Sequence, residues 1–208
     1  TAEAPAADSA AAITTNSISG WPQASDITST AAIVMETSTN TVLFSKNADQ
    51  QLYPASAVKI MTCLIALENS SLDDQVTMTA TGVSGVTDGG ASISAQLDEV
   101  FTMEQCLYAI MVGSANDIAL QVAEHVGGSV EAFVEKMNAR AQELGCTNTV
   151  FTNPTGLPDE NQHITAHDMA LIMETAMENE TFRTIAATSS YTIPATNVSG
   201  GDRVLSNS

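Results

Sequence analysis

The chain has 208 residues, of which 44% are hydrophobic, and 24 acidic side chains against six lysines and arginines give it a formal net charge of −18. This length is sufficient to bury one sizeable core, which indicates a single domain or a domain with a subdomain. Six scattered cations cannot form the basic surface that attracts nucleic acids or anionic lipids, so we expect neither as a direct partner.

Residues 1–24 are an Ala-, Ser- and Thr-rich segment of low complexity. We predict that they form a disordered leader, because so few large apolar side chains cannot offset the entropy lost on ordering. The segment lacks the basic start and the apolar stretch of a signal peptide, so we expect that any signal peptide has already been removed. No later stretch approaches the roughly 20 apolar residues of a membrane helix. Residues 25–208 are expected to form the folded domain.

Strand patterns come first in this domain. Two β-rich runs separated by a short polar turn predict a hairpin over residues 31–46. After a break at Tyr53-Pro54, an apolar run predicts a helix over residues 56–69. A short strand at residues 75–79 and a Gly-rich loop at residues 83–91 follow.

The middle region, from residue 56 to about residue 180, is predicted to be mostly helical. Thr102 with Gln105, and Thr165 with Asp168, have the spacing of capping boxes, which mark helix starts. The helices expected after residue 100 cover residues 103–112, 117–125, 130–144 and 166–179. The last apolar run, residues 190–197, predicts a strand or an extended loop.

Ser56 and Lys59 are the first candidate catalytic residues, at the start of the helix predicted over residues 56–69. Positions three apart lie on one face of a helix, so the hydroxyl and the amine would be neighbours. A serine becomes an effective nucleophile when a nearby base takes its proton, and a buried lysine with a lowered pKa can be that base. The pattern alone is also typical of a capping serine and of a lysine that extends to solvent.

Ser114 and Asn116 are the second pair of candidates, in a break between two apolar helices. A loop in such a place can point polar groups into a cleft. There Ser114 would pass on a proton, and Asn116 would hold Lys59 or a substrate amide. Taken alone, the tripeptide is also typical of an ordinary helix cap.

The three cysteines and three histidines predict no metal site. Cys63, Cys106 and Cys146 fit no zinc spacing, and we expect buried free thiols. His163 and His167 come nearest to a ligand pattern, but surface and capping histidines produce the same spacing.

Four segments are more informative together than singly: AAIVMETSTNTVLFSKNADQQLYPAS, YPASAVKIMT, VGSANDIA and LGCTNTVFTNPTGLPDENQHITAHDMALI. In this order they resemble the serine-type D-alanyl-D-alanine carboxypeptidases, which are low-molecular-weight penicillin-binding proteins. YPASAVKIMT is similar to the nucleophile segment P-A-S-x-x-K-x-M-T of that family, and VGSANDIA is similar to its S-G-N-D-A segment. The likeness extends from about Trp21 to Ser208.

The resemblance implies an α/β fold of the α+β type, the β-lactamase and penicillin-binding transpeptidase-like architecture of an antiparallel sheet beside a helical subdomain. It also implies roles for the four candidates. Ser56 would be the acylated nucleophile and Lys59 its general base. Ser114 would relay the proton towards the leaving group, and Asn116 would help to position the substrate and the lysine.

The implied substrate is a peptidoglycan stem peptide ending in D-Ala-D-Ala, which loses its last D-alanine through an acyl-enzyme. β-Lactams would acylate the same serine and hydrolyse slowly. No metal or organic cofactor is implied. The implied location is extracytoplasmic, at the cell wall or the outer face of the cytoplasmic membrane, with membrane contact only through segments outside these 208 residues.

Three features depart from the family pattern, and one of them is that Cys106 and Cys146 stand where relatives usually have other apolar residues. The third motif of the family, K-T-G, is absent, because none of the three lysines is followed by Thr-Gly. We therefore expect residues 25–208 to be a partial catalytic domain that is truncated before the last strands. In addition, Thr155 stands where relatives often have histidine.

Two alternatives use the same fold. The absent third motif favours a non-catalytic module that binds or senses the cell wall, or an inactive fragment. A β-lactamase would need a deacylating glutamate in a loop after the S-x-N helix. In this chain that loop offers only Asp159 and Glu160.

Overall fold

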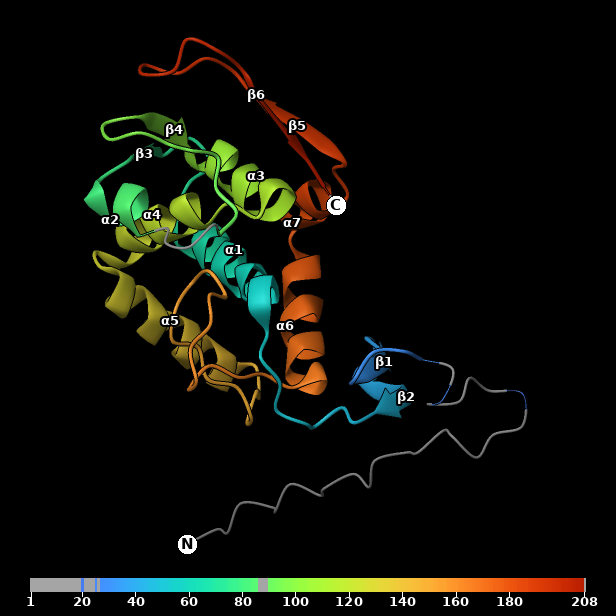
Figure 1. Ribbon diagram of the computed structural model, residues 1–208. Helices are drawn as coiled ribbons and strands as arrows, with labels where there is room; N and C mark the ends of the chain where they lie inside the picture. The colour runs from blue at the N-terminus through green and yellow to red at the C-terminus, as the bar shows by residue number, and fades with distance from the viewer. Residues whose placement is uncertain (1–19, 21–24, 26, 86–89, 208) are drawn as a thin grey trace, which may run out of the picture.

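The computed structural model of the chain describes residues 20, 25, 27–85 and 90–207 (Figure 1). The predicted leader, apart from Gly20, lies outside the described residues, as does part of the predicted Gly-rich loop. Within the described ranges, no helix combines the length and the apolar character needed to cross a membrane.

Helix α1 (Val58–Asn69) is the centre of the core, with eight of its twelve residues buried. A helix that is apolar on nearly every side has to be surrounded by other elements, because no face of it suits water. Figure 1 shows α1 running through the middle of a helical body, in contact with α3, α4, α5, α6 and α7. In that order these helices span Met103–Gly113, Asn116–Gly127, Val130–Glu143, Ala166–Glu178 and Glu180–Ala186.

The strands lie at the edges of this helical body in antiparallel pairs, β1 with β2, β3 with β4, and β5 with β6. They are β1 (Ala32–Glu36), β2 (Thr41–Lys46), β3 (Gln75–Thr77), β4 (Val100–Thr102), β5 (Ser190–Ile193) and β6 (Arg203–Ser206). The predicted first hairpin and the α/β class with antiparallel pairing are thus confirmed. In the part of the chain that the structure describes, the strands form three two-stranded sheets. Figure 1 shows β1–β2 and β5–β6 near opposite ends of α6 and α7.

The helix starts follow the predicted capping chemistry, with one difference. At α3, Thr102 Oγ1 accepts from the Gln105 N–H at 3.2 Å and Gln105 Oε1 accepts from the Thr102 N–H at 2.9 Å, which completes the capping box. At α6, Thr165 Oγ1 accepts from the Asp168 N–H at 3.0 Å. The Asp168 carboxylate turns to the hydroxyl of Thr149 at 2.7 Å. It therefore ties α6 to a distant loop, which the spacing in sequence could not indicate.

The predicted Gly-rich loop begins as a short helix, α2 (Ala80–Ser84). Gly82 lies in it because the helix packs closely against α4. A Cβ at this position would be 2.5 Å from the end of the Met78 side chain and 2.9 Å from the Asp117 carbonyl. Of the loop predicted over residues 83–91, only residues 83 and 84 belong to this helix, so the described part of the loop starts after Ser84.

All three cysteines are buried and unpaired, as predicted. Cys63, Cys106 and Cys146 are at most 3% exposed. Burial raises the pKa of each thiol, that of Cys146 to about 12. Such thiols contribute apolar packing, since a reactive cysteine needs a thiolate.

A buried ion pair attaches the β5–β6 hairpin to the rest of the domain. Arg203 donates to both carboxylate oxygens of Glu99, at 2.8 and 3.0 Å, and the Glu99 side chain has no exposure. The Thr196 hydroxyl also donates to this carboxylate. Burial alone would raise the pKa of Glu99, but these hydrogen bonds outweigh it and hold the pKa below its ordinary value. Arg203 also lies 5.6 Å from the ring centre of Phe101 on β4.

Arg203→Met should lower the free energy of unfolding by about 3–5 kcal/mol near pH 7, because Glu99 would remain as a buried charge without its partner. The loss should shrink as the pH falls, since a carboxyl with a depressed pKa stabilises the fold only where it is ionised. Urea unfolding at two pH values measures both effects. Arg203→Met/Glu99→Met should be less destabilised than the single variant, and equal losses would contradict the assignment.

Candidate active site

Ser56 lies in the bend that leads into α1. A 3₁₀ turn, Ala55–Ala57, comes first, and the α-helix begins at Val58, so the predicted helix start was two residues early. The bend follows Pro54, and Ala55 adopts a left-handed φ of +47°. Ser56 is exposed at this helix start, where backbone N–H groups have no acceptor within the helix.

Lys59 lies one turn further along and is only 3% exposed. Its Nζ is 2.7 Å from Asn116 Oδ1, 2.6 Å from the Thr155 carbonyl and 3.5 Å from Ser56 Oγ. Burial lowers the pKa of this amine from 10.5 to about 8. The sequence pattern left open whether this lysine reaches solvent, and the structure buries it.

The three contacts of Lys59 differ in a way that matters for chemistry. A neutral amine has two N–H donors and one lone pair. The two short contacts, to Asn116 Oδ1 and the Thr155 carbonyl, use both donors. The lone pair then remains for the third neighbour, the hydroxyl of Ser56 at 3.5 Å. Contacts of this length in an empty site commonly shorten when substrate binds.

Ser114 reaches Ser56 from the end of α3. Its hydroxyl is 3.1 Å from Ser56 Oγ and is placed to donate to it. The residue has a left-handed backbone, with φ +52° and ψ +30°, which is uncommon for serine. The preceding residue, Gly113, packs against β6, because a Cβ at this position would lie 3.3 Å from the Leu205 side chain.

Asn116 is the first residue of α4 and is 5% exposed. Its backbone N–H donates to the Ala91 carbonyl at 2.8 Å. The next residue, Asp117, accepts from the Ser92 hydroxyl at 2.6 Å and from the Ala95 N–H at 3.1 Å. These bonds fix the start of α4 against residues 91–95, and so fix the direction of the Asn116 side chain.

A loop at residues 152–157 forms the third side of the site. Its Thr155 carbonyl accepts from Lys59, while Thr155 Oγ1 donates to Asn153 Oδ1 at 2.8 Å. Thr62, buried on α1, donates its hydroxyl proton to the Pro154 carbonyl at 2.7 Å. The loop therefore sits directly on the helix that carries Lys59.

Gly156 shows how closely this loop approaches the nucleophile. Its φ is +83°, and a Cβ there would be 1.9 Å from the Ala55 carbonyl oxygen and 3.0 Å from the Ser56 N. Sequence reasoning missed the role of the Thr155 carbonyl in this loop, because a backbone carbonyl belongs to every residue and leaves no residue-type signal. The Pro-Thr-Gly turn was the available indication, since glycine there marks a close approach or a positive φ.

The four predicted residues thus meet in one place, from two parts of the chain, and the loop at residues 152–157 adds a third. His163 and His167 lie elsewhere, with His163 Nδ1 3.1 Å from the Asn161 carbonyl and His167 Nδ1 3.4 Å from Asp49 Oδ1. Among the described residues, no group of three or more His, Cys, Asp or Glu side chains is arranged to hold a metal ion.

The sequence profile of the D-alanyl-D-alanine carboxypeptidases, family Peptidase S11, matches residues 18–200. The chain belongs to this family. It is 36% identical over 163 residues to the D-alanyl-D-alanine carboxypeptidase DacF of Bacillus subtilis, covering 76% of this chain and 41% of DacF. It is 30% identical over 188 residues to the D-alanyl-D-alanine carboxypeptidase of Streptomyces sp. K15, covering 86% of this chain and 65% of that protein. The chain thus spans less than two thirds of the length of these two relatives.

Solved structures agree with this assignment. The crystal structure of the Streptomyces K15 DD-transpeptidase superposes with a TM-score of 0.80 at 30% identity, over 87% of this chain and 74% of that one. The D-alanyl-D-alanine carboxypeptidase of Mycobacterium tuberculosis superposes with a TM-score of 0.77 at 29% identity, over 86% and 66%. The predicted penicillin-binding fold is confirmed.

Gly156→Ala should lower the free energy of unfolding by about 2–4 kcal/mol, from the strained φ together with the clash against Ala55. Gly145→Ala is the matched control, since its φ is also +83° but nothing lies within 4 Å of its Cβ. That variant should lose only about 1 kcal/mol. Urea unfolding measures both. Equal losses would mean that the loop does not press on the nucleophile turn.

Proposed function

We propose that the protein is a serine D,D-carboxypeptidase that removes the terminal D-alanine from peptidoglycan stem peptides. The observation that carries this proposal is the placement of Ser56 Oγ between two proton carriers, 3.5 Å from Lys59 Nζ and 3.1 Å from Ser114 Oγ. Membership of the D-alanyl-D-alanine carboxypeptidase family supports it.

Acylation begins with Ser56. Its oxygen attacks the carbonyl carbon of the penultimate D-alanine while its proton passes to the lone pair of Lys59. The backbone N–H of Ser56, at the helix start, is the donor expected nearest to the developing oxyanion. The peptide C–N bond then breaks, and Ser114 gives its proton to the leaving D-alanine nitrogen. Lys59 returns the proton to Ser114, so the serine proton ends on the released amine.

Deacylation uses the same groups. Water attacks the ester carbonyl, Lys59 takes the proton of the water, and the C–O bond to Ser56 breaks. The truncated peptide leaves as an acid and Ser56 recovers its hydroxyl. Asn116 and the Thr155 carbonyl keep the two N–H donors of the amine occupied, so the lone pair stays directed at the reacting oxygen.

We also propose that β-lactams bind this protein and that it acts outside the cytoplasm. β-Lactams would acylate Ser56 as mimics of the D-Ala-D-Ala end. The substrate implies an extracytoplasmic location at the cell wall. The 208 residues contain no K-T-G sequence, which the family resemblance assigns to binding of the substrate carboxylate. The experiments therefore use the protein in its full natural length.

Labelled penicillin should attach covalently to the protein, and Ser56→Ala should abolish the label. Ser71→Ala is the control, because Ser71 is an exposed serine just beyond the far end of α1. Gel fluorescence and peptide mapping give the readout. A label that survives in Ser56→Ala, or maps to another residue, would refute the assignment of the nucleophile.

The penicillin acylation rate should depend on pH through Lys59. With a pKa of about 8, roughly a tenth of the amines are neutral at pH 7. The base is the neutral form, so the rate should rise nearly tenfold per pH unit at acidic pH and level off above about pH 8. Stopped-flow labelling between about pH 5.5 and 9.5 tests this. A rate that falls with rising pH would exclude Lys59 as the base.

The fate of the acyl-enzyme separates the proposal from its rivals. Rapid loss of the penicillin label with opened β-lactam would indicate a β-lactamase, for which Asp159 and Glu160 are the available loop acids. Binding of a D-Ala-D-Ala peptide without D-alanine release would indicate a non-catalytic module.

The Streptomyces K15 relative is named both a carboxypeptidase and a DD-transpeptidase. Mass spectrometry with an added amine acceptor would therefore distinguish hydrolysis from transfer.

A further inference from the structure

Side chains hold the loop at residues 152–157 in shape. Every backbone N–H in this range donates to a side-chain oxygen, and the one proline has no N–H to donate. Gln162 Oε1 accepts from the first two of these N–H groups, at 3.1 and 3.2 Å. Asn153 Oδ1 accepts from the N–H groups of Thr155 and Gly156, at 3.1 and 2.8 Å. Thr155 Oγ1 accepts from the last one at 3.1 Å. The path of the loop therefore depends on three side chains.

Asn153 and Lys59 hold opposite ends of one peptide unit. This unit joins Thr155 to Gly156, and in a trans peptide the C=O and the N–H point in opposite directions. Its N–H donates to Asn153 Oδ1 at 2.8 Å, and its carbonyl accepts from Lys59 Nζ at 2.6 Å. The bond to Asn153 therefore fixes the direction in which this carbonyl points.

The same loop also fixes the Asn153 amide. Its Oδ1 accepts from the Thr155 hydroxyl at 2.8 Å, and its Nδ2 donates to the Leu157 carbonyl at 3.1 Å. The oxygen thus has to face the peptide unit, because only the oxygen can accept from the N–H groups. All the described hydrogen bonds of this side chain lie within the loop. Asn153 therefore affects the site only through the peptide unit.

We propose that Asn153 is a positioning residue for acylation, because it holds the Thr155 carbonyl on Lys59. This inference rests on the proposed function and adds a residue that acts on the base from outside the reacting groups. With the carbonyl in place, one N–H of the neutral amine is occupied, and the lone pair is left for Ser56 Oγ at 3.5 Å. Without Asn153 the peptide unit can turn, and Lys59 then loses one of its two short acceptors.

Asn153→Ala should slow the acylation of Ser56 by penicillin even at alkaline pH, where Lys59 is already neutral. The limiting rate should fall at least about tenfold, because a misplaced reacting group costs up to about a hundredfold. The rate should also level off at a lower pH, since the ammonium loses an acceptor that favours its charged form. Stopped-flow labelling of the protein in its natural length measures both. A limiting rate within about twofold of that of the unchanged protein would overturn the proposal, because misplacement of the base should cost far more.

Asn153→Asp is the rescue variant. Its carboxylate can accept from the same three donors, so the limiting rate should stay within about threefold of that of the unchanged protein. The added negative charge favours the Lys59 ammonium, so the rate should level off at a higher pH. A purely structural asparagine would not give opposite pH shifts in its two variants. A loss of about tenfold or more in Asn153→Asp would contradict the proposal even if Asn153→Ala does not fold, because the carboxylate keeps the acceptors.

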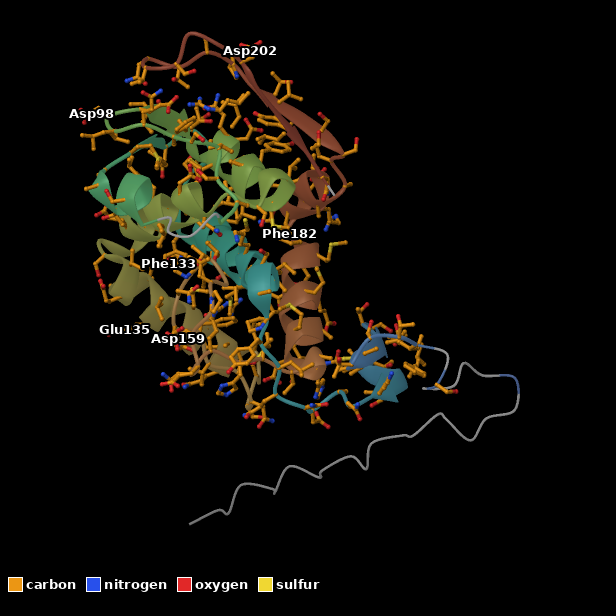
Figure 2. The ribbon with its side chains drawn as sticks, in the orientation of Figure 1. Asp98, Phe133, Glu135, Asp159, Phe182 and Asp202 are labelled. Atoms are coloured by element: carbon orange, nitrogen blue, oxygen red, sulfur yellow. The ribbon has the colours of Figure 1, made fainter. Side chains whose placement is uncertain are left out.

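Asn197→Ala is the matched control, because Asn197 also clamps two backbone groups. Its Oδ1 accepts from the Val100 N–H at 2.9 Å, and its Nδ2 donates to the Asp98 carbonyl at 2.8 Å. Figure 2 shows Asp98 at the opposite end of the molecule from Asp159, which lies just after the loop at residues 152–157. The control should keep the acylation rate and its pH profile. An equal slowing in the control would refute the assignment.

A measurement without turnover separates this inference from the proposed function. NMR of protein labelled at the ε carbons of lysine follows the titration of Lys59, whose signal is assigned by its loss in Lys59→Arg. Cys63, the titratable neighbour of Lys59 on α1, stays a neutral thiol in this range because burial raises its pKa. The pKa of Lys59 should fall in Asn153→Ala, rise in Asn153→Asp and stay unchanged in Asn197→Ala.

The two sets of results can fail independently. If the pKa of Lys59 shifts as expected but penicillin does not label Ser56, the contact through the peptide unit is supported and the proposed function fails. If penicillin labels Ser56 while the pKa of Lys59 is the same in all the variants, only the positioning role of Asn153 fails.

Discussion

The buried amine of Lys59 is the constraint on which the rest of the site depends. A charged group that is 3% exposed is destabilised unless acceptors replace its lost water. The two acceptors at 2.7 and 2.6 Å come from residues 57 and 96 positions away in the sequence. These two hydrogen bonds only partly replace the water that Lys59 loses on burial, so the pKa of its amine is about 8. An amine with this pKa can both accept and return a proton near neutral pH. The burial of α1 thus lowers the pKa of Lys59, so that it can act as a base. The same burial makes hydrogen bonds from this amine to Asn116 and to the Thr155 carbonyl necessary.

The same packing concentrates backbone strain around the nucleophile. Ala55 and Ser114 both have left-handed backbones, at φ +47° and +52°, although neither is glycine. Each costs of order 1–3 kcal/mol and persists only where the surroundings hold it. The support comes from Gly156, which lies against the Ala55 carbonyl, and from Asp117, which clamps the start of α4. The elements that give the site its geometry are therefore also those that keep it from relaxing.

Local sequence patterns predicted most of the helices and strands. They did not predict features that depend on close packing between distant segments. The capping box at Thr102 and the apolar period of α1 were readable because both act within a few residues. The close packing at Gly82 was not predicted, since it depends on a contact with Asp117, which is 35 positions away in the sequence. The role of the Thr155 carbonyl had no residue-type signal at all.

The sequence by itself determined which groups were available: a serine three positions before a lysine, a second serine close to an asparagine, and an acidic chain with few cations. It also determined the order of hairpin and helices, because hydrophobic period and capping are short-range properties. Only the tertiary structure decided that the lysine is buried, that its Nζ lies 3.5 Å from Ser56 Oγ, and that a loop carbonyl accepts a hydrogen bond from it. The extent to which a side chain loses water and the direction in which it points both depend on the residues around it. Those residues come together only when distant segments of the chain have packed against one another.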